Sequence, residues 1–578
     1  MELLTCKVNG IEVSVPKGST VLEAARAAGV HIPTLCYLKD INEIGACRIC
    51  LVEATGARGL VTACVCPVTD GMEIKTNTEK VQKARKTTLE LILSTHNKKC
   101  LSCVRSTDCE LQKLCRDYGV EESSFEGFKP EYEIDYSMPH LVRDNNKCIV
   151  CRRCVAACKQ QFVSVIGANN RGIDTSIGSP FDLPLNTTSC IACGQCTVVC
   201  PTGALTEADD TQKVWDALAD PTKHVVVNTA PSIRATLGEC FGMPIGTNVE
   251  GKMVTALRRL GFDKVFDTDF AADLTIVEEA NELVERIQNG GTLPMITSCS
   301  PGWVRFAEFY YPELLNHLSS CKSPQQMMGA VIKTYYAEKM GIDAKDIVVV
   351  SVMPCTAKKF EITRDDMDAA GYPDTDISIT TRELARMIQR AGLDFVALPD
   401  EKFDSPLGES TGAAVIFGAT GGVMEAALRT ANDWLTGKDV DALDYTAVRG
   451  TAGLKQAEAD INGMKVKVAV ASGAAAAKVV MDRIQAGNPD GWTFIEIMGC
   501  PGGCVNGGGQ PLQPAHVRNT LDLKSLRAKA LYDADSNMPI RKSHKNPDIT
   551  KLYEEYLEKP GSHKAHHILH TTYVKRQK

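Results

Sequence analysis

The pattern of hydrophobic and polar positions changes its period along the chain. Near the start, apolar and polar residues alternate on both sides of Asn9-Gly10, which predicts a β-hairpin with a tight turn. Two stretches of helical period follow, VLEAARAAGV, which ends at Gly29, and KVQKARKTTLELILSTHN. After Lys213 the pattern changes again, to apolar strand-like runs that alternate with helices.

The strand-like runs predict the fold of the second half. Helical patterns separate them, such as RELARMIQRAG, which follows a capping box of Thr380 and Glu383 and ends at Gly392. Alternation of this kind predicts an α/β catalytic domain with parallel sheets and flanking helices. The runs are His224–Asn228, Thr292–Thr297, Ile347–Met353, Val466–Ala471 and Thr493–Met498.

Composition limits the class of protein. The chain has 578 residues, too many for one hydrophobic core, so roughly three to five domains are expected. Its 44% hydrophobic and 23% charged residues and its net charge of −7 are ordinary. The charge argues neither for nor against nucleic acid, and we expect no nucleic-acid partner. The sequence contains no run of about 18 apolar residues, which a membrane span would need. The start MELLTCKVNG lacks an export signal. We therefore expect a cytoplasmic protein.

Cysteine is the most informative residue type. Without an export signal, the 24 cysteines are expected to bind metal in a reducing, anaerobic setting. The run C-x2-C-x2-C-x3-C occurs twice, as in two-cluster ferredoxins, where each run gives three thiolates to its own 4Fe–4S cube and a fourth to the other. A zinc ribbon, the main alternative, has no third cysteine at the same step. The predicted ligands are Cys148, Cys151, Cys154, Cys158, Cys190, Cys193, Cys196 and Cys200.

Two further cysteine sets precede these runs. The spacing C-x10-C-x2-C-x13-C resembles a ferredoxin-like 2Fe–2S domain, and Cys6 and Cys66 outside it are expected to be buried thiols. The spacing H-x3-C-x2-C-x5-C can hold a 4Fe–4S cube, since iron accepts imidazole or thiolate; a zinc site beside a surface histidine is the alternative. Cys115 has no assignment. The two sets are Cys36, Cys47, Cys50 and Cys64, and His96, Cys100, Cys103 and Cys109.

Four of the five predicted strands run directly into unusual loops. These contain Ala230-Pro231, Cys299-Ser300, Pro354-Cys355 and, in the last, two cysteines and a run of glycines. Ligand sites in open α/β sheets lie beyond the carboxyl ends of strands, so the loops should converge on one pocket. The glycine run is not followed by GK[ST], so we interpret it as backbone that approaches a bulky cofactor.

These loops carry a resemblance to a known family. TSCSPGW, MPCTAKK and MGCPGGCVNGGGQP resemble the signature loops of iron-only (FeFe) hydrogenases, and FGATGGVMEAALR is a further match. The front half is similar to the long, multi-cluster clostridial form, and the tail is similar to the small subunit of two-chain periplasmic members. The resemblance implies reversible oxidation of H2, with electrons relayed to ferredoxin or to a flavin-containing, NAD(P)-linked subunit of a multi-subunit or bifurcating hydrogenase.

The resemblance also implies site residues. An H-cluster is expected, in which a 4Fe–4S cube shares the Cys504 sulfur with a diiron unit that carries CO, cyanide and azadithiolate. Cys355 and Cys500 would hold the cube, Lys358 would donate to a cyanide, and Cys299 would pass protons. The diiron pocket would be lined by Pro231, Ser232, Gln325, Met353, Phe417 and Met498, and the proton path would use Glu279, Ser319, Glu282 and Arg286. From the residues alone, Glu279 and Glu282 belong to the solvated face of an acidic helix.

One position departs from the family pattern. The usual loop is TSCCPGW, whose second cysteine ligates the cube, and this chain has Ser300 there. Ser300 could ligate through oxygen, the loop could shift so that Cys299 ligates, or Cys321 or Cys240 could substitute. Oxygen is a poorer partner for iron–sulfur than thiolate. We keep Cys299 as the proton relay and leave the fourth ligand open.

The overall expectation is an α/β catalytic domain preceded by α+β ferredoxin-like iron–sulfur domains. A pure electron conduit would need no cysteine-bearing pocket, and hydrogen sensors of the family tend to lack Cys299, so an enzyme is favoured. With one 2Fe–2S cluster, three accessory 4Fe–4S clusters and the H-cluster, the chain would hold about 20 irons. The expected domains are 1–80 (2Fe–2S), 81–125 (4Fe–4S with one histidine and three cysteine ligands), 126–209 (two-cluster), 210–530 (H-cluster) and 531–578 (small-subunit-like tail).

Overall fold

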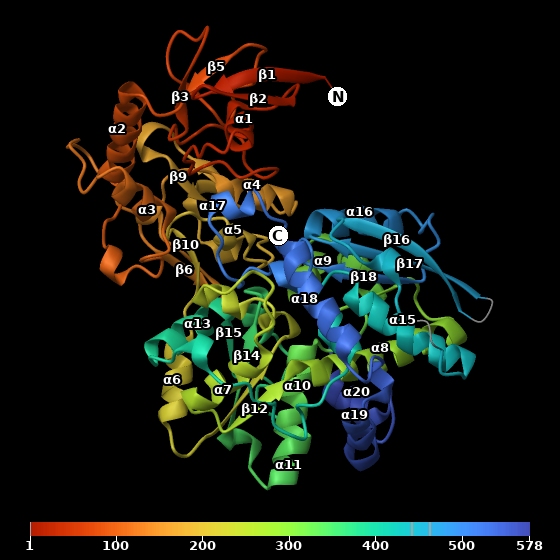
Figure 1. Ribbon diagram of the computed structural model, residues 1–578. Coiled ribbons are helices and arrows are strands. Elements are labelled where there is room, and N and C mark those ends of the chain that lie inside the picture. Colours follow the sequence, from red (N-terminus) through yellow and green to blue (C-terminus); the bar gives the residue numbers. More distant parts are fainter. Residues whose placement is uncertain (1, 441–442, 462–463, 578) are drawn as a thin grey trace.

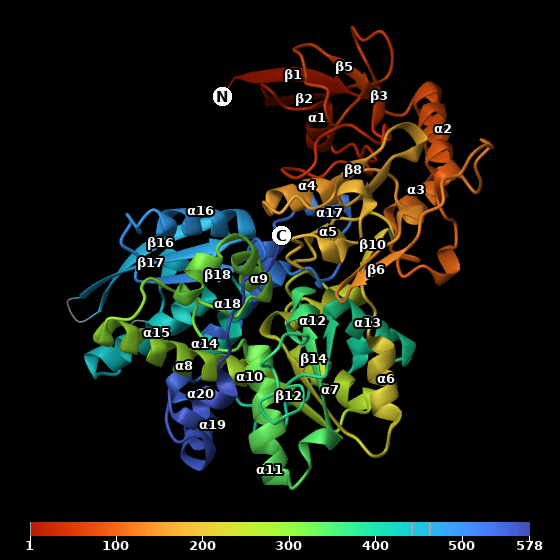
Figure 2. The same ribbon diagram turned by 180° about the vertical axis from the view of Figure 1, so that it is seen from behind.

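The structure is a computed structural model that describes residues 2–440, 443–461 and 464–577. Figures 1 and 2 show the N-terminal cysteine-rich segments at one end of the molecule and the strands and helices of the second half at the other. The segment that contains α4 (Arg153–Gln160) and α5 (Gln195–Val198) lies between them. Within the described ranges, no helix is long and apolar enough to span a membrane.

The predicted hairpin is confirmed. β1 (Leu3–Val8) pairs antiparallel with β2 (Ile11–Pro16). Asn9 and Gly10 have φ of 50° and 87°, the left-handed values that a two-residue turn of this kind requires. α1 (Val21–Ala27) follows, with a capping box at its start. The hairpin joins a five-stranded sheet of order β2-β1-β5-β3-β4, with β3 at Leu51–Ala54, β4 at Val61–Thr62 and β5 at Glu73–Lys75.

The two duplicated cysteine runs have the same backbone path. Each turns through a left-handed residue directly before its helix, Arg152 (φ 61°) before α4 and Gly194 (φ 65°) before α5. Each helix then carries the third cysteine of its run, Cys154 or Cys196. The sequence repeat is therefore a structural repeat. The surrounding elements are α2 (Glu79–Thr95), α3 (Glu110–Asp117), β6 (Asp135–Met138), β7 (Leu141–Arg143), β8 (Gly167–Asn169), β9 (Ser176–Gly178) and β10 (Leu205–Glu207).

Two four-stranded sheets form the second half. The first, of order β12-β11-β14-β15, is parallel throughout. The second, of order β13-β18-β17-β16, is parallel except for the pairing of β16 with β17. The prediction of largely parallel sheets is thus confirmed. The strands are β11 (His224–Thr229), β12 (Lys264–Asp267), β13 (Met295–Ile296), β14 (Ile347–Met353), β15 (Ile377–Thr380), β16 (Leu454–Ile461), β17 (Met464–Ser472) and β18 (Phe494–Met498).

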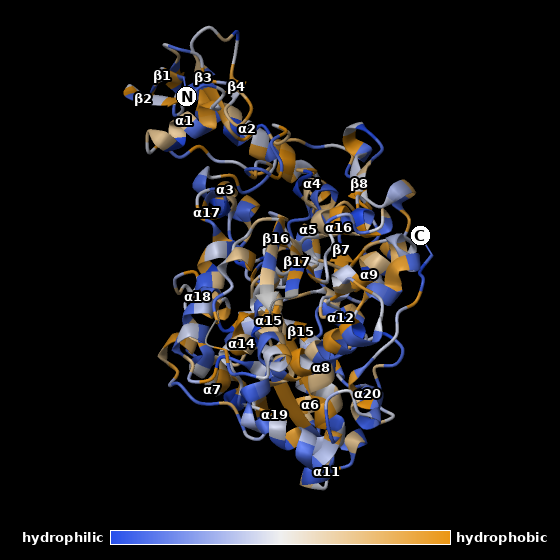
Figure 3. Cartoon of the chain, turned by 90° about the vertical axis from the view of Figure 1, so that its right-hand side faces the viewer, coloured by the Kyte–Doolittle hydropathy of each residue, from blue (hydrophilic) through white to orange (hydrophobic). Residues whose placement is uncertain are grey.

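α8 (Thr268–Asn289) is buried along most of its length. One of its faces, which includes Leu274, packs into the core beside β11 and β14, and another, which includes Ile276, packs into the core of the second sheet. Apolar segments accordingly concentrate in the strands and inner helices in Figure 3. The other helices are α6 (Thr211–Ala219), α7 (Glu250–Leu260), α9 (Pro301–Tyr310), α10 (Pro324–Val331), α11 (Ala337–Met340), α12 (Ala357–Glu361), α13 (Thr381–Arg390), α14 (Gly412–Val415), α15 (Gly422–Thr436), α16 (Ala474–Gln485) and α17 (Ala515–Arg518).

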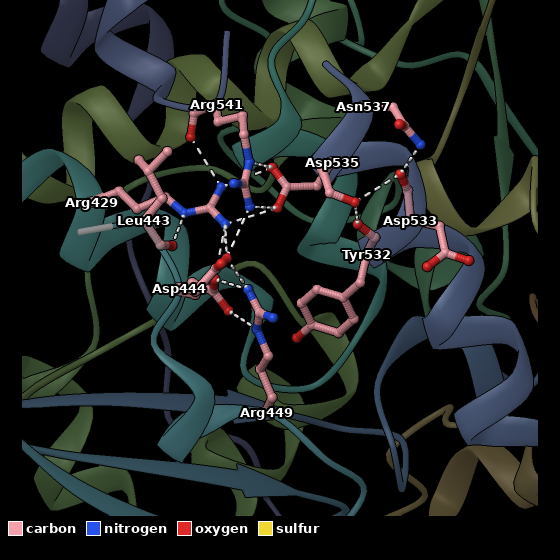
Figure 4. Close-up of polar contacts among 11 residues, drawn as sticks. Arg429, Leu443, Asp444, Arg449, Tyr532, Asp533, Asp535, Asn537 and Arg541 are labelled. Carbon is pink, nitrogen blue, oxygen red and sulfur yellow. Dashed lines mark hydrogen bonds and ion pairs between the residues drawn. The ribbon is translucent and has the colours of Figure 1, made fainter. Parts of the chain in front are cut away.

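The C-terminal tail is fixed to the catalytic half by a buried charge network. Arg429 of α15 donates to Asp535 of α18 (Leu523–Asn537) at 2.8 and 3.0 Å (Figure 4). It also donates to Glu425 at 2.8 Å. Arg541 reaches the same Asp535 carboxylate at 2.7 Å. Removing one partner would leave a buried charge unpaired, so this contact holds α18 in place. α19 (Pro547–Leu552) and α20 (His563–Leu569) complete the tail. The expected domain boundaries after residues 80 and 530 lie inside α2 and α18, and these boundaries remain predictions.

Candidate active site and iron–sulfur ligands

Loops from both sheets surround one cavity. The residues directly after β11, β14 and β18, and shortly after β13, contribute to its wall, as expected for parallel strands. The cavity has a volume of about 70 Å³ and a mostly apolar lining. Ser232 is not on the wall: it lies behind it, and its Oγ accepts a hydrogen bond from Gln510 at 3.2 Å. The predicted residues that do line the cavity are Pro231, Cys299, Ser300, Gln325, Met353, Cys355, Lys358, Phe417, Met498, Cys500 and Cys504.

Three cysteine side chains face this cavity, of which Cys500 is buried and Cys355 and Cys504 are partly buried. A hydrogen bond with Cys500 lowers the pKa of Cys355, whereas burial raises the pKa of Cys504 to about 12. Thiolates are the form that binds iron, and a metal stabilises them where the protein alone does not. The donor set of Cys355, Cys500 and Cys504 therefore fits an iron–sulfur group.

Ser300 lies at the start of α9 but does not cap it. Its Oγ instead accepts a hydrogen bond from the Gly499 backbone N–H at 2.9 Å, which ties two of the strand-end loops together. Cys321 and Cys240, considered as substitutes, are not among the cavity residues. Cys321 Sγ faces Glu282 at 3.9 Å. Ser300 and Cys299 are therefore the candidates for a fourth ligand that reach the cavity.

Lys358 is held at the cavity wall by partners that the sequence did not indicate. Its ammonium contacts Glu361 at 2.9 Å, Ser323 Oγ at 2.7 Å and the Cys299 carbonyl at 3.2 Å. Glu361 also accepts from Ser323 at 2.8 Å and from Gln325 at 3.0 Å. Glu361 was not predicted, although its i, i+3 spacing from Lys358 on the short α12 is a sequence signal that could have identified it. The buried Glu361 carboxylate therefore holds the Lys358 ammonium in place at the cavity wall.

Glu279 is not on a solvated face, and that interpretation is wrong. It has no exposed surface, because α8 packs between two cores, and neither carboxylate oxygen has a hydrogen-bond partner among the described residues. Burial, reinforced by the charge of Glu282, raises the pKa of Glu279 to about 8. Burial and the charge of Glu279 likewise raise the pKa of Cys299 well above its usual value. Both groups thus carry a proton at neutral pH.

The remaining residues of the expected proton path form a connected set. Glu282 accepts a hydrogen bond from Ser319 Oγ at 2.7 Å and pairs with Arg286 at 2.6 Å. Ser319 is fully buried, whereas Glu282 and Arg286 are partly exposed, with side chains 15% and 16% accessible. The set therefore runs from the interior toward the surface.

The crossed arrangement of the duplicated cysteines is present in the geometry. Cys200, from the second run, lines one cavity together with Cys148, Cys151 and Cys154 of the first. Burial raises the pKa of Cys190 to about 11, and the neighbouring Cys158 adds to the effect. Cys158 has the same influence on Cys193 and Cys196. Each run therefore sends its fourth cysteine to the other set.

The cysteines of the first set also come together. Cys50 and Cys64 lie 3.3 Å apart, and Cys36 Sγ accepts from the Cys47 backbone at 3.5 Å. His96 is buried, and its Nδ1 has no hydrogen-bond partner among the described residues. Cys6 is buried as predicted, whereas Cys66 is only partly buried.

The second duplicated run packs directly on the glycine-rich loop of the cavity. Gln195 Nε2 donates to the Asn506 carbonyl at 2.9 Å, and Thr197 Oγ1 donates to the Gly508 carbonyl at 3.0 Å. A Cβ on Gly508 would lie 2.4 Å from the Cys193 carbonyl oxygen. Only glycine allows this approach, so Gly508 serves the contact with the neighbouring cysteine loop. The approach of the glycine run to a bulky cofactor stays a prediction.

Cysteine sets spaced for clusters, next to a buried thiol-lined cavity at the strand ends, define a multi-cluster iron–sulfur oxidoreductase. Residues 223–508 match the iron only hydrogenase large subunit, C-terminal domain, and residues 521–576 match the iron hydrogenase small subunit. The chain belongs to the iron-only hydrogenase family. Its front half matches a 2Fe-2S iron-sulfur cluster binding domain (2–79), the NADH-ubiquinone oxidoreductase-G iron-sulfur binding region (85–124) and a 4Fe-4S dicluster domain (147–204).

Similar proteins support this family assignment. The chain is 49% identical to the NADP-reducing hydrogenase subunit HndD of Solidesulfovibrio fructosivorans over 100% of both chains. It is 46% identical to iron hydrogenase 1 of Clostridium pasteurianum over 99% of this chain and 100% of that one. A solved variant of the apo [FeFe]-hydrogenase HydA1 from Chlamydomonas reinhardtii is 40% identical, with a TM-score of 0.57, over 64% of this chain and 100% of that one. The expected family, fold class and hydrogenase activity are confirmed.

Proposed function

We propose that the chain interconverts H2 with protons and electrons by keeping the two products on opposite sides of the cavity. The H-cluster, with the CO, cyanide and azadithiolate ligands of the family, supplies the heterolytic cleavage of H2 when bound. Cys355, Cys500 and Cys504 would hold it, with Ser300 or Cys299 as the fourth candidate. Pro231, Met353, Phe417 and Met498 would exclude water, and Ser232 would support the wall from behind.

On the proton side, the chain provides groups that can hold a proton away from water. Cys299 Sγ and the Glu279 carboxyl both have raised pKa values, so each stays protonated in the interior and can exchange a proton with its neighbour. Ser319 and Glu282 continue this path by a hydrogen bond, and Arg286 fixes the orientation of Glu282 at the partly exposed end. Lys358 places a positive charge at the wall, where an anionic ligand would sit.

On the electron side, the accessory clusters would carry single electrons toward the surface. The supporting observation is the contact between the Cys193 loop and the glycine-rich loop, because it puts the nearest cluster site beside the cavity. The ligands would be the crossed duplicated cysteines, then the His96 set and the 2Fe–2S set, for three accessory cubes and one 2Fe–2S centre.

The electron partner is proposed to be ferredoxin or a flavin-containing, NAD(P)-linked hydrogenase subunit in the cytoplasm. Full-length similarity to a subunit named NADP-reducing hydrogenase favours the second. The chain has no dinucleotide fingerprint of its own, so a nicotinamide would bind a partner. If the purified enzyme under H2 reduces ferredoxin but no flavoprotein, ferredoxin is the electron partner.

Expression in a host without hydrogenase maturation enzymes tests the assignment of the active site. The purified protein should contain the cubes and the 2Fe–2S centre but evolve no H2 and show no infrared bands from CO or cyanide. After maturation, the bands and the activity should appear together, at about 20 irons per chain. Activity without maturation would contradict a diiron site, and stoichiometric zinc would contradict the His96 assignment.

A further inference from the structure

A buried histidine faces one of the cluster cysteines from outside the ligand set. His140 lies in the turn between β6 and β7 and is 1% exposed. Its Nε2 is 4.0 Å from Cys190 Sγ, at the limit of a hydrogen bond to sulfur. Its Nδ1 has no hydrogen-bond partner among the described residues. The family patterns and the expected ligands leave this residue without a role.

The contacts of the ring decide what it can do. A ring nitrogen that carries a proton is a hydrogen-bond donor, and Nε2 is the ring nitrogen that faces a sulfur acceptor. Nδ1 faces no partner among the described residues. Nε2 is therefore the position from which His140 can donate to Cys190.

A cation approaches the same cysteine from another element. Arg305 of α9 donates from Nε to the Cys190 carbonyl at 2.7 Å, and its guanidinium lies 4.1 Å from the Phe360 ring centroid. No carboxylate of the described residues forms a salt bridge with it. The Cys190 end of the second cluster site therefore receives a hydrogen-bond donor and a nearby positive charge, on which Glu308 of the same helix also acts.

The first cluster site lacks this arrangement. Its cavity wall includes Arg143 and Arg152 but neither His140 nor Arg305. Cys148 Sγ accepts from the backbone N–H of Val150 at 3.3 Å, as Cys190 does from that of Ala192, so the histidine is the additional contact of Cys190. The two halves of the repeat thus differ at their first cysteine. The difference falls on the site whose Cys193 lies beside the active-site loop.

We propose that the Nε2–H of His140 donates to Cys190 Sγ and raises the reduction potential of the 4Fe–4S cluster next to the active-site cavity. Adding an electron makes the cluster more negative, and a donor to its sulfur stabilises that state. His140 is then a positioning and tuning residue that makes this cluster the preferred resting place of an electron near the cavity. The inference rests on the proposed assignment of Cys190 as a ligand.

Redox titration of the matured enzyme, followed by electron paramagnetic resonance, tests this role. His140→Leu removes the donor and should lower the midpoint of one 4Fe–4S cluster at unchanged iron content. We expect the ratio of reduced to oxidised cluster at the original midpoint to fall roughly tenfold, which is about 59 mV for a one-electron couple. His140→Gln, whose amide can donate a hydrogen bond, should recover part of the midpoint potential that His140→Leu loses. His566→Leu, at an exposed position on α20, is the matched control and should change no potential.

A second measurement needs no variant. With 15N-histidine in the wild-type enzyme, pulsed resonance of the reduced cluster should detect coupling to one imidazole nitrogen in addition to that of the His96 site. Unchanged potentials in His140→Leu with full iron, or absence of that coupling, would overturn the inference. If the wild-type protein shows no paired 4Fe–4S signals, the assignment of Cys190 as a cluster ligand is wrong. That result differs from an unchanged potential in His140→Leu, which would contradict only the role of His140.

Discussion

The cysteine-rich front of the molecule and the cavity at the strand ends are assembled in different ways. The ligands of the duplicated runs lie within 53 residues of sequence, Cys148 to Cys200, and each helix that presents them starts at a left-handed residue repeated in both runs. The cavity wall instead takes residues from Ala230 to Gly507, which only the parallel order of the strands brings together. Local spacing builds the electron side, and topology builds the proton side.

This comparison predicts different responses to substitution. A ligand in a cysteine run serves one cluster site, so its loss should be confined to that cluster. A residue of the proton side acts through neighbours on other elements, so its loss should change turnover without changing iron. The following predictions test that distinction, beginning with the largest expected effect.

Cys299→Ala should show the largest loss of turnover at intact iron. Removal of a proton-transfer group typically costs about 10²–10⁴-fold, and Cys299 is the group on the cavity wall that can take this role. Iron content and the infrared bands of the matured protein should be unchanged, as measured by metal analysis and infrared spectroscopy. If iron is lost with the diiron unit, Cys299 is the fourth cube ligand and the relay assignment is wrong.

Glu279→Gln should cost less, about 10²-fold, because an amide keeps the shape of the side chain but cannot exchange a proton. It should also change how stability depends on pH. The pKa of Glu279 is raised in the folded protein to about 8, so between the unfolded value and 8 the folded state binds more protons, and stability falls as pH rises. The stability of Glu279→Gln should lack this dependence on pH.

The measurement is anaerobic calorimetry of both proteins at pH 6 and pH 8. The melting temperature of Glu279→Gln relative to wild type should be higher at pH 8 than at pH 6. Glu285→Gln, at a more exposed position on the same helix, should show no such change. An equal difference at both pH values would mean that Glu279 ionises like an exposed carboxylate, which would contradict its burial.

The burial of Glu279 also marks the limit of prediction from sequence. The hairpin at Asn9-Gly10, the capping box at Thr380 and the parallel strands follow from local chemistry and period, and the sequence was sufficient for them. The acidic pattern of α8 indicated a solvated face, because a single helix gives no sign that two sheets will cover it. Glu361 was missed for a similar reason: its partners Ser323 and Gln325 come from a separate segment of the chain.

Ser300→Cys is expected to have a smaller effect on activity. If Ser300 Oγ ligates the cube, a thiolate there should keep turnover within about tenfold and shift the potential of the active-site cube, because sulfur is the better partner for iron. If it does not, the change should be nearly silent, apart from the lost hydrogen bond from Gly499. Spectroelectrochemistry of the matured variant decides between the two. A silent variant together with iron loss in Cys299→Ala would assign the ligand to Cys299.

The smallest effect is expected where the tail touches the proton path. Tyr573 donates from its hydroxyl to the Ser319 carbonyl, and the backbone of Thr571 donates to Ser320 at 2.8 Å. Tail residues therefore hold the segment that carries Ser319 against α8. Tyr573→Phe removes one hydrogen bond worth about 1 kcal/mol, which corresponds to at most about a fivefold change in the population of the productive Ser319 position.

Turnover of Tyr573→Phe should fall by no more than that factor, with unchanged iron and infrared bands. The reduction should be larger at a pH where proton transfer limits the rate, which a pH–rate profile measures against wild type. Tyr556→Phe, on the same tail but not in contact with this segment in the described structure, is the matched control. An equal loss in both variants would show that the tail contributes general stability only, whereas a loss confined to Tyr573→Phe would extend the proton side of the comparison to the C-terminal end of the chain.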